Sequence, residues 1–352
     1  MMFSKRTFGL IAIAAALTLN GCLEIETTTV VRGDGTVTRT VIVTGDSSSI
    51  SEGRHLLSLD TTWRRDFRKK DERNYELVAV KSFEDPGEMN ESLRGTKGTT
   101  LDIRVDFGKQ FYWFFTRYFY RETWRKFNPF DTIPMSQYLS PKEIELFQKH
   151  EILKEPFESP DDSLALQRAQ ERFMAWQNRN VFEDFYAEFL NGVKALADPS
   201  LTAEDVETRK EELFEGVENL IEVNAIDTLP RVFGAILRSP LAVEAVKKNA
   251  AGFERFRRKM EFVQEIMENS YKNAVVMPGL IVETNAPAIE GNRVSWDDFI
   301  AYCYFGDYEM TVESRAVNWL VVVLTGAFCV AILVFYIVGN IRKRRKSREE
   351  GF

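Results

Sequence analysis

The sequence predicts an α+β protein. An antiparallel sheet from N-terminal and late strands carries a long helical-bundle insertion, and one C-terminal transmembrane helix follows. Three observations lead to this prediction. Runs rich in Val, Ile and Thr occur near the N-terminus and strand-like segments return after residue 273. Between them, over residues 140–272, apolar residues recur in steps of three and four, the spacing of one helix face. Residues 316–341 form an uncharged apolar run.

The N-terminal strands are predicted on either side of residues 32–35, Arg-Gly-Asp-Gly. Asp-Gly between β-rich segments is a strong hairpin signal, because tight turns need residues that tolerate positive φ. We therefore interpret the Arg-Gly-Asp tripeptide, which also occurs in cell-adhesion ligands, as turn chemistry. Further strands are expected at 75–81 and 100–107, with a short helix at 85–93 between them.

The late strands are expected at residues 274–284, 293–296 and 308–314, where they would pair with the N-terminal ones. Pro278 lies inside the first of them and cannot donate a hydrogen bond to a neighbouring strand. That strand is therefore expected at a sheet edge or with a bulge.

Residues 111–120 contain eight aromatic side chains in ten positions. Such density does not fit a strand with one face in water. Three alternatives remain: burial between a sheet and helices, an apolar cavity that accommodates lipid, or contact with a membrane. In a single strand, alternation places four of the aromatic residues on one side. The candidate ligand-lining residues are therefore Phe111, Trp113, Phe115 and Phe119.

Helix starts are marked by capping residues. Ser140, Ser159 and Thr202 each stand three positions before an acidic residue, the pattern of a capping box, and Ser239-Pro240 marks another start. The apolar stripes that follow predict a helical bundle with an ordinary packed core.

The N-terminus has the features of a bacterial lipoprotein signal. Lys5 and Arg6 precede an apolar stretch that is shorter than the roughly 20 residues of a membrane span. Leu19-Asn20-Gly21-Cys22 then matches a lipobox, which predicts that Cys22 is acylated and becomes the first mature residue. The alternative is an ordinary signal peptide that contains a cysteine. An acyl group at Cys22 is expected to hold the N-terminal strand at the bilayer surface.

Residues 316–341 are long enough to cross about 30 Å of hydrocarbon. Trp319 and Tyr336 lie near the ends of this run, where aromatic rings favour the interface, and a basic tail follows at 342–352. The positive-inside rule places that tail in the cytoplasm. We therefore expect a single-pass protein of the cytoplasmic membrane, with a lipid-anchored N-terminus and its body outside the cytoplasm.

Composition restricts the partners and the chemistry. The net charge is −7, and removing two positive charges for the signal and a net four for the tail leaves the body near −13. An acidic body argues against nucleic acid. Cys303 is expected to be a buried apolar residue. His55 and His150 are far apart and expected at the surface, and no metal-binding or nucleophile motif is present. The sequence predicts no cofactor, no metal and no enzymatic activity.

The predicted boundaries follow from these features. They are a signal peptide at 1–21, the β-rich half of an extracytoplasmic domain at 22–136, a helical insertion at 137–272, closing strands at 273–315, a transmembrane helix at 316–341 and a cytoplasmic tail at 342–352.

Several short segments resemble a bacterial family of LppM-like membrane lipoproteins. They are Gly21-Cys22 before an alternating strand and the Asp34-Gly35 turn, then Met277-Pro278-Gly279, Asn285-Ala286 and the run Gly291-Asn292-Arg293-Val294-Ser295-Trp296. The resemblance covers residues 22–107 and 273–341, and the helical insertion departs from it. It implies a membrane-anchored envelope domain with an apolar lipid-binding cavity and no catalytic residues.

The main hypothesis is a non-enzymatic envelope lipoprotein that acts as a scaffold or binding module on the outer face of the cytoplasmic membrane. The alternative is a lipid-binding or lipid-transfer domain with an aromatic-lined cavity. The expected partners are membrane lipids and an envelope protein.

Overall fold

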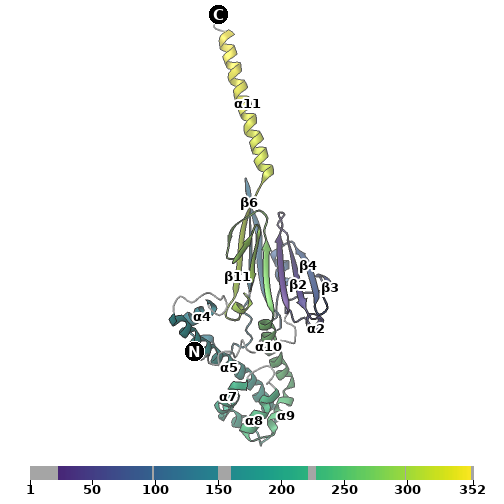
Figure 1. Ribbon diagram of the computed structural model, residues 1–352, viewed down its shortest axis with the longest axis vertical. Coiled ribbons are helices and arrows are strands. Elements are labelled where there is room, and N and C mark those ends of the chain that lie inside the picture. Colours follow the sequence, from purple (N-terminus) through teal and green to yellow (C-terminus); the bar gives the residue numbers. More distant parts are fainter. Residues whose placement is uncertain (1–22, 97–98, 150–159, 221–226, 298, 350–352) are drawn as a thin grey trace.

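The computed structural model describes residues 23–349, except 97–98, 150–159, 221–226 and 298. Its parts lie along one long axis (Figure 1). The C-terminal helix α11 (Trp319–Glu349) projects from one end of a β-rich body, and most of the other helices lie at the opposite end. This mixed α+β architecture, with a helical insertion and one apolar C-terminal helix, confirms the predicted fold class.

Two sheets, here called the sandwich, form the β-rich body. The seven-stranded sheet has the order β3 (Arg64–Lys69), β4 (Tyr75–Phe83), β2 (Val37–Gly45), β1 (Glu24–Val31), β7 (Ser270–Val276), β10 (Arg293–Asp297) and β9 (Ala288–Glu290). The four-stranded sheet has the order β5 (Ile103–Tyr112), β6 (Phe115–Trp124), β11 (Tyr308–Val317) and β8 (Leu280–Thr284). All pairs are antiparallel except β1 with β7.

The Arg-Gly-Asp-Gly segment forms the turn between β1 and β2, as predicted. The backbone N–H of Gly35 donates to the carbonyl of Arg32, and the Asp34 carboxylate accepts from the backbone of Thr36 at 2.9 Å. Only Gly35 of the Asp-Gly pair takes a positive φ, of 95°.

The expected strand at 274–284 is in fact two strands in different sheets. β7 ends at Val276, and the chain then crosses to β8 at the edge of the four-stranded sheet. Gly279 makes this crossing possible: its φ is +82°, and a Cβ there would lie 2.2 Å from the Arg315 carbonyl oxygen. Pro278 therefore lies where the chain changes from one sheet to the other. β8, which follows it, is an edge strand, as the proline predicted.

The remaining described helices are short except for two. They are α2 (Ser47–Ser51), α3 (Pro86–Ser92), η1 (Met135–Gln137), α4 (Pro141–Phe147), α5 (Pro160–Leu196), α6 (Ala203–Thr208), α7 (Lys210–Val217), η3 (Glu218–Leu220), α8 (Leu229–Leu237), α9 (Leu241–Lys248), α10 (Ala250–Glu268) and η5 (Ile300–Tyr304). The capping boxes predicted at Ser140 and Thr202 are both formed. Ser159 lies outside the described residues.

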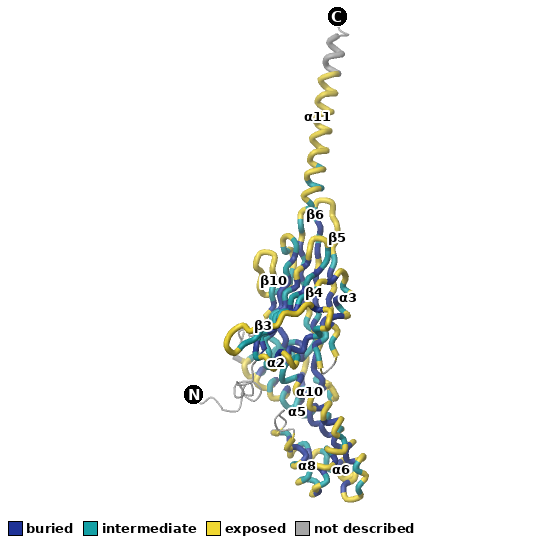
Figure 2. Tube along the Cα trace, turned by 90° about the vertical axis from the view of Figure 1, so that its right-hand side faces the viewer, coloured by how far each residue is buried: buried dark blue, intermediate teal, exposed yellow. Residues whose placement is uncertain are grey.

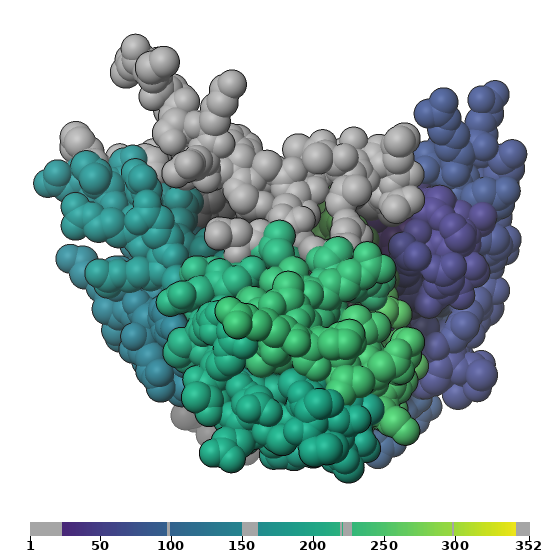
Figure 3. Space-filling model, turned by 90° about the horizontal axis from the view of Figure 1, so that it is seen from below, coloured from purple at the N-terminus to yellow at the C-terminus, as the bar shows by residue number. Residues whose placement is uncertain are grey.

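The helical module, defined as α5 to α10, is joined to the sandwich by its two longest helices. The first half of α5 buries Phe173 and Trp176 in the core of the sandwich, whereas its second half lines a separate helical core. In the same way α10 places Ile266 in the first core and Phe256 in the second. Seen from the helical end, the module forms one compact mass (Figure 3). Because α5 and α10 each extend through both cores, they fix the orientation of the helical module relative to the sandwich.

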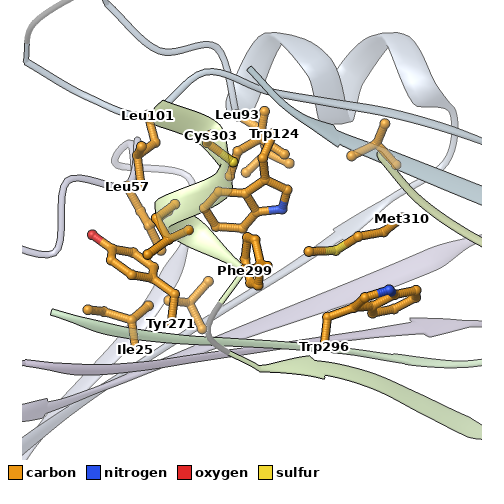
Figure 4. Close-up of a cluster of buried hydrophobic side chains, with 14 of the residues drawn as sticks. Ile25, Leu57, Leu93, Leu101, Trp124, Tyr271, Trp296, Phe299, Cys303 and Met310 are labelled. Atoms are coloured by element: carbon orange, nitrogen blue, oxygen red, sulfur yellow. The ribbon is translucent and has the colours of Figure 1, made fainter. Parts of the chain in front are cut away.

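Aromatic side chains fill the space between the sheets at their helical end (Figure 4). Trp124 meets Phe299 edge-on with ring centroids 4.9 Å apart, and it contacts Tyr271 at 6.1 Å. Cys303 is completely buried beside them, as predicted. Burial raises the pKa of its thiol well above the usual value, so this cysteine is a packing residue.

A fully buried ion pair lies at the centre of the sandwich. Arg39 of β2 makes two parallel hydrogen bonds to Glu122 of β6, at 2.8 and 2.9 Å. Glu122 also accepts from the Tyr120 hydroxyl at 2.6 Å and from the Trp124 indole at 2.7 Å. Because the four donors come from both sheets, this network aligns one sheet on the other.

Candidate membrane-contact site

The aromatic segment 111–120 is a β-hairpin, so the condition of a single strand, under which the four candidate residues share one side, is not met. β5 ends at Tyr112, residues 113–114 form a two-residue turn, and β6 begins at Phe115. The alternation that grouped the four candidate residues is therefore broken. Phe111 lies on β5, Trp113 lies in the turn, and Phe115 and Phe119 lie on β6.

The hairpin separates the aromatic residues into two groups. Tyr118 and Tyr120 point inward and are buried, but they lie between the two sheets and not between a sheet and helices as the first alternative had it. The residues nearest the turn are exposed, with exposed fractions of 61% for both Phe111 and Trp113. We call this outer group the aromatic tip: Phe111, Tyr112, Trp113, Phe114 and Phe115.

The aromatic tip is fastened to the start of α11 through Asn318. The Asn318 backbone N–H donates to the Phe114 carbonyl at 2.9 Å, and its side-chain amide donates to the Trp113 carbonyl at 3.0 Å. Its side-chain oxygen accepts from the Thr116 hydroxyl at 2.8 Å. β11 ends directly before Asn318. This residue therefore connects the aromatic tip, the four-stranded sheet and α11.

Trp113 also reaches along the helix itself. Its indole N–H donates to the Thr325 hydroxyl at 3.3 Å. Thr325 lies six residues beyond Trp319, which is about 9 Å at 1.5 Å per residue. A membrane that surrounds α11 would therefore also surround the indole ring of Trp113.

α11 is long and apolar enough to cross a membrane over Trp319–Arg342, a stretch of 24 residues. Figure 2 shows it exposed along nearly all of its described length. The expected start at residue 316 is wrong by three positions, because Ala316 and Val317 are the last residues of β11. Composition alone placed the boundary too early, since both residues are apolar.

Basic side chains surround the base of the aromatic tip. Arg117 forms an ion pair with Glu313, with its Nε 2.9 Å from the carboxylate, and this hydrogen bond raises the pKa of Arg117. Arg315 lies over the Phe115 ring, 5.2 Å from its centroid. Lys109 donates to the Gly33 carbonyl at 3.4 Å in the β1–β2 turn. Tryptophan, tyrosine and arginine in this arrangement are typical of the membrane interface.

The start of β1 lies far from this site. Leu23 is completely buried, and its backbone N–H donates to the Asn269 side chain at 3.0 Å. At that end Tyr271, the register partner of Ile25, packs on Trp124. Trp124 is nine residues along β6 from the aromatic tip, or about 30 Å. Cys22 and the signal peptide lie outside the described residues, and the strand that follows them begins at the end of the sandwich opposite the aromatic tip.

His55 differs from the expected surface position. His55 is buried, and its Nδ1 accepts from the Leu57 backbone at 3.2 Å. Burial, with a smaller effect of the Arg65 charge, lowers the pKa of His55 to about 4. His150 lies outside the described residues. Over the part of the chain that the structure describes, no group of three or more His, Cys, Asp or Glu side chains is placed to hold a metal ion.

The helical module has a shallow groove between α5, α8, α9 and α10. Its volume is about 180 Å³, and Phe185, Val246 and Phe253 line its apolar part. Four charged side chains also line it, namely Asp227, Arg231, Lys247 and Arg257. This volume is below the roughly 300–1,000 Å³ that small-molecule sites occupy. A protein side chain would fit the groove better than a lipid or a cofactor.

No family model, curated protein or solved structure matches the chain. The resemblance to LppM-like lipoproteins therefore stays a prediction.

Proposed function

We propose that the protein is a non-enzymatic, membrane-mounted scaffold of the cell envelope that presents its helical module to a partner protein at a distance from the bilayer. One observation carries the proposal: α11 and the helical module lie at opposite ends of the sandwich (Figure 1). A protein whose site lay at the membrane surface would not need this separation.

The contacts at both ends support a rigid mount. Asn318 joins the membrane helix to the aromatic tip, and α5 and α10 each extend from the core of the sandwich into that of the module. The aromatic tip adds a second contact with lipid, because burying a fully exposed Phe side chain gains about 1.5–3 kcal/mol and each partly exposed tip residue gains a share of that. Together the tip and α11 would keep the sandwich upright.

The orientation follows from the sequence. The basic residues after Ile341 favour a cytoplasmic tail, so the sandwich and the module would lie outside the cytoplasm. Lipidation of Cys22 remains part of the proposal on the strength of the lipobox.

Site-specific photo-crosslinking in intact cells tests the scaffold function. A photoreactive phenylalanine replaces Val243, which is 37% exposed beside the groove, or Arg121, on the outer face of β6. We expect one discrete protein adduct from position 243 and none from position 121. Charge reversal at the groove, Arg231→Glu, should abolish the adduct. Absence of an adduct at position 243, or equal adducts at both positions, would contradict the proposal.

The lipid-transfer alternative has less support from the structure. The space between the sheets is occupied by Trp124, Phe299 and Tyr271 (Figure 4). The exposed residues of the aromatic tip favour lipid contact at the bilayer over a cavity inside the body. A lipid recovered stoichiometrically after α11 has been removed by proteolysis would favour transfer.

A further inference from the structure

We infer that Arg315 and Arg117 form a binding site for the phosphate of an anionic phospholipid headgroup, in the leaflet that contacts the aromatic tip. The inference rests on the proposed membrane mounting and adds the class of lipid that this surface selects.

The two arginines are direct neighbours in the four-stranded sheet. Arg315 of β11 and Arg117 of β6 are register partners. Like charges directly opposite each other destabilise a sheet unless something compensates them. Glu313 compensates Arg117, with side-chain exposed fractions of 27% and 37%. Arg315 has no ion pair within the described residues and is exposed.

The guanidinium of Arg315 is directed toward the membrane. It lies over the ring of Phe115. Phe115 pairs with Val317, and this pair is the next one with outward-facing side chains, on the side of α11, after the pair Arg117–Arg315. The Arg315 backbone is three residues from Asn318, about 10 Å at the rise of a strand. The headgroup layer of one leaflet is about 5–8 Å thick. An arginine side chain that extends toward the tip therefore brings its donors to the level of the phosphates.

The local charge also differs from that of the body. The body carries a net charge near −13, which repels anionic lipid. At this end, however, the four basic residues Arg32, Lys109, Arg117 and Arg315 exceed by one the acidic residues Asp34, Glu313 and Glu283, the last being the register partner of Glu313. Arginine holds phosphate through two parallel N–H donors, so a pair of arginines suits a phosphodiester.

Lipid selectivity of the full chain in nanodiscs tests the site. The nanodiscs contain phosphatidylcholine with a minor fraction of phosphatidylglycerol, and spin-labelled lipids of both classes report the relative association constant. We expect the wild-type protein to prefer phosphatidylglycerol. Each of the substitutions Arg117→Gln and Arg315→Gln should lower this preference about fivefold. The matched control is Arg121→Gln, on the same face of the same strand pair and paired with Glu309 at 3.7 Å.

A variant with the opposite effect keeps the test independent of folding. Glu313→Gln frees Arg117 and should increase the preference. The cytoplasmic tail is the same in every variant, so it cannot produce a difference between them. Unchanged selectivity in the double variant Arg117→Gln/Arg315→Gln, or an equal loss in Arg121→Gln, would overturn the inference. Insertion into nanodiscs of phosphatidylcholine alone is measured in parallel, and its failure would instead count against the membrane mounting.

Discussion

Removal of the charge of Arg39 should destabilise the protein far more than removal of any surface arginine. The Arg39→Met variant leaves Glu122 completely buried with two of its four donors, Tyr120 and Trp124. Breaking a buried ion pair from one side costs about 3–5 kcal/mol, because the remaining charge stays out of water. The two retained donors place the expected loss near the lower end, at about 3 kcal/mol at neutral pH.

The pH dependence gives this prediction a second readout. Burial by itself raises the pKa of Glu122, but the charge and hydrogen bonds of Arg39 outweigh it, so the native pKa is lowered. In the wild type this stability is present above the unfolded pKa of about 4.3 and is lost as pH falls through the native value. In Arg39→Met the largest opposing effect is lost, and the remaining hydrogen bonds, such as that from Tyr120, oppose burial alone, so the pKa of Glu122 should rise. The defect should therefore shrink as the pH is lowered from neutral.

Urea unfolding of the full-length protein in mild detergent, followed by near-ultraviolet circular dichroism, measures these differences. The double variant Arg39→Met/Glu122→Gln should recover much of the loss, because no charge stays buried. Arg121→Met is the surface control, expected to cost less than about 1 kcal/mol. A loss below about 1 kcal/mol in Arg39→Met, or a double variant as unstable as the sum of the single ones, would refute the reasoning.

Three further outcomes are expected. The native pKa of His55, about 4, lies below its unfolded value of about 6.5. The free energy of unfolding should therefore fall by on the order of 3 kcal/mol as the pH drops between these values. His55→Asn should flatten that pH dependence in urea titrations. Burial raises the pKa of Glu265 to about 7 despite the opposing charge of Arg54, so stability is lost as pH rises through that value. Glu265→Gln should therefore melt higher than wild type at about pH 8 and equally at about pH 5. In nanodiscs with nitroxide-labelled lipid and a Cys329→Ala background, a fluorophore at Phe111→Cys should be quenched and one at Glu52→Cys should not; equal quenching would show that the sandwich lies flat.

Local signals predicted the elements that they mark. Asp34-Gly35 located the first hairpin, Ser140 and Thr202 located two helix starts, and the uncharged run located α11 within three residues at its start. Each of these is a short-range effect: a turn conformation, a cap, or a hydrophobic length. The sequence alone was sufficient for them.

Features that depend on long-range pairing were not predicted. β3 was missed because all six of its residues are exposed at a sheet edge, so no alternation marks it. The second sheet was missed because nothing near Pro278 shows that the chain changes partners there. The hairpin at 111–120 was hidden because its turn, Trp113-Phe114, has no glycine, asparagine or proline.

The buried ion pair did leave a signal. Arg39 occupies an inward position of β2, between Val37 and Val41, and Glu122 occupies an inward position of β6, between Tyr120 and Trp124. When each of two strands has one charged residue among its inward-facing apolar positions, and the two charges are opposite, the pattern indicates that the strands face each other. This pattern would have predicted that the first hairpin packs on the aromatic one.

If α11 and the aromatic tip lie in one bilayer, an acyl group on Cys22 would be too far away to insert into it. Leu23, the residue before β1, lies about 30 Å from the aromatic tip, and β1 is paired on both sides, with β2 and β7. The acyl chains of one leaflet span only about 15 Å, half of the hydrocarbon thickness. An acyl group on Cys22 could reach the membrane of α11 only if β1 left the sheet, which would expose the core around Ile25 and Tyr271. Under the proposed mounting, retention in that membrane would therefore depend on α11 and the aromatic tip, and acylation of Cys22 would act at the helical end of the sandwich.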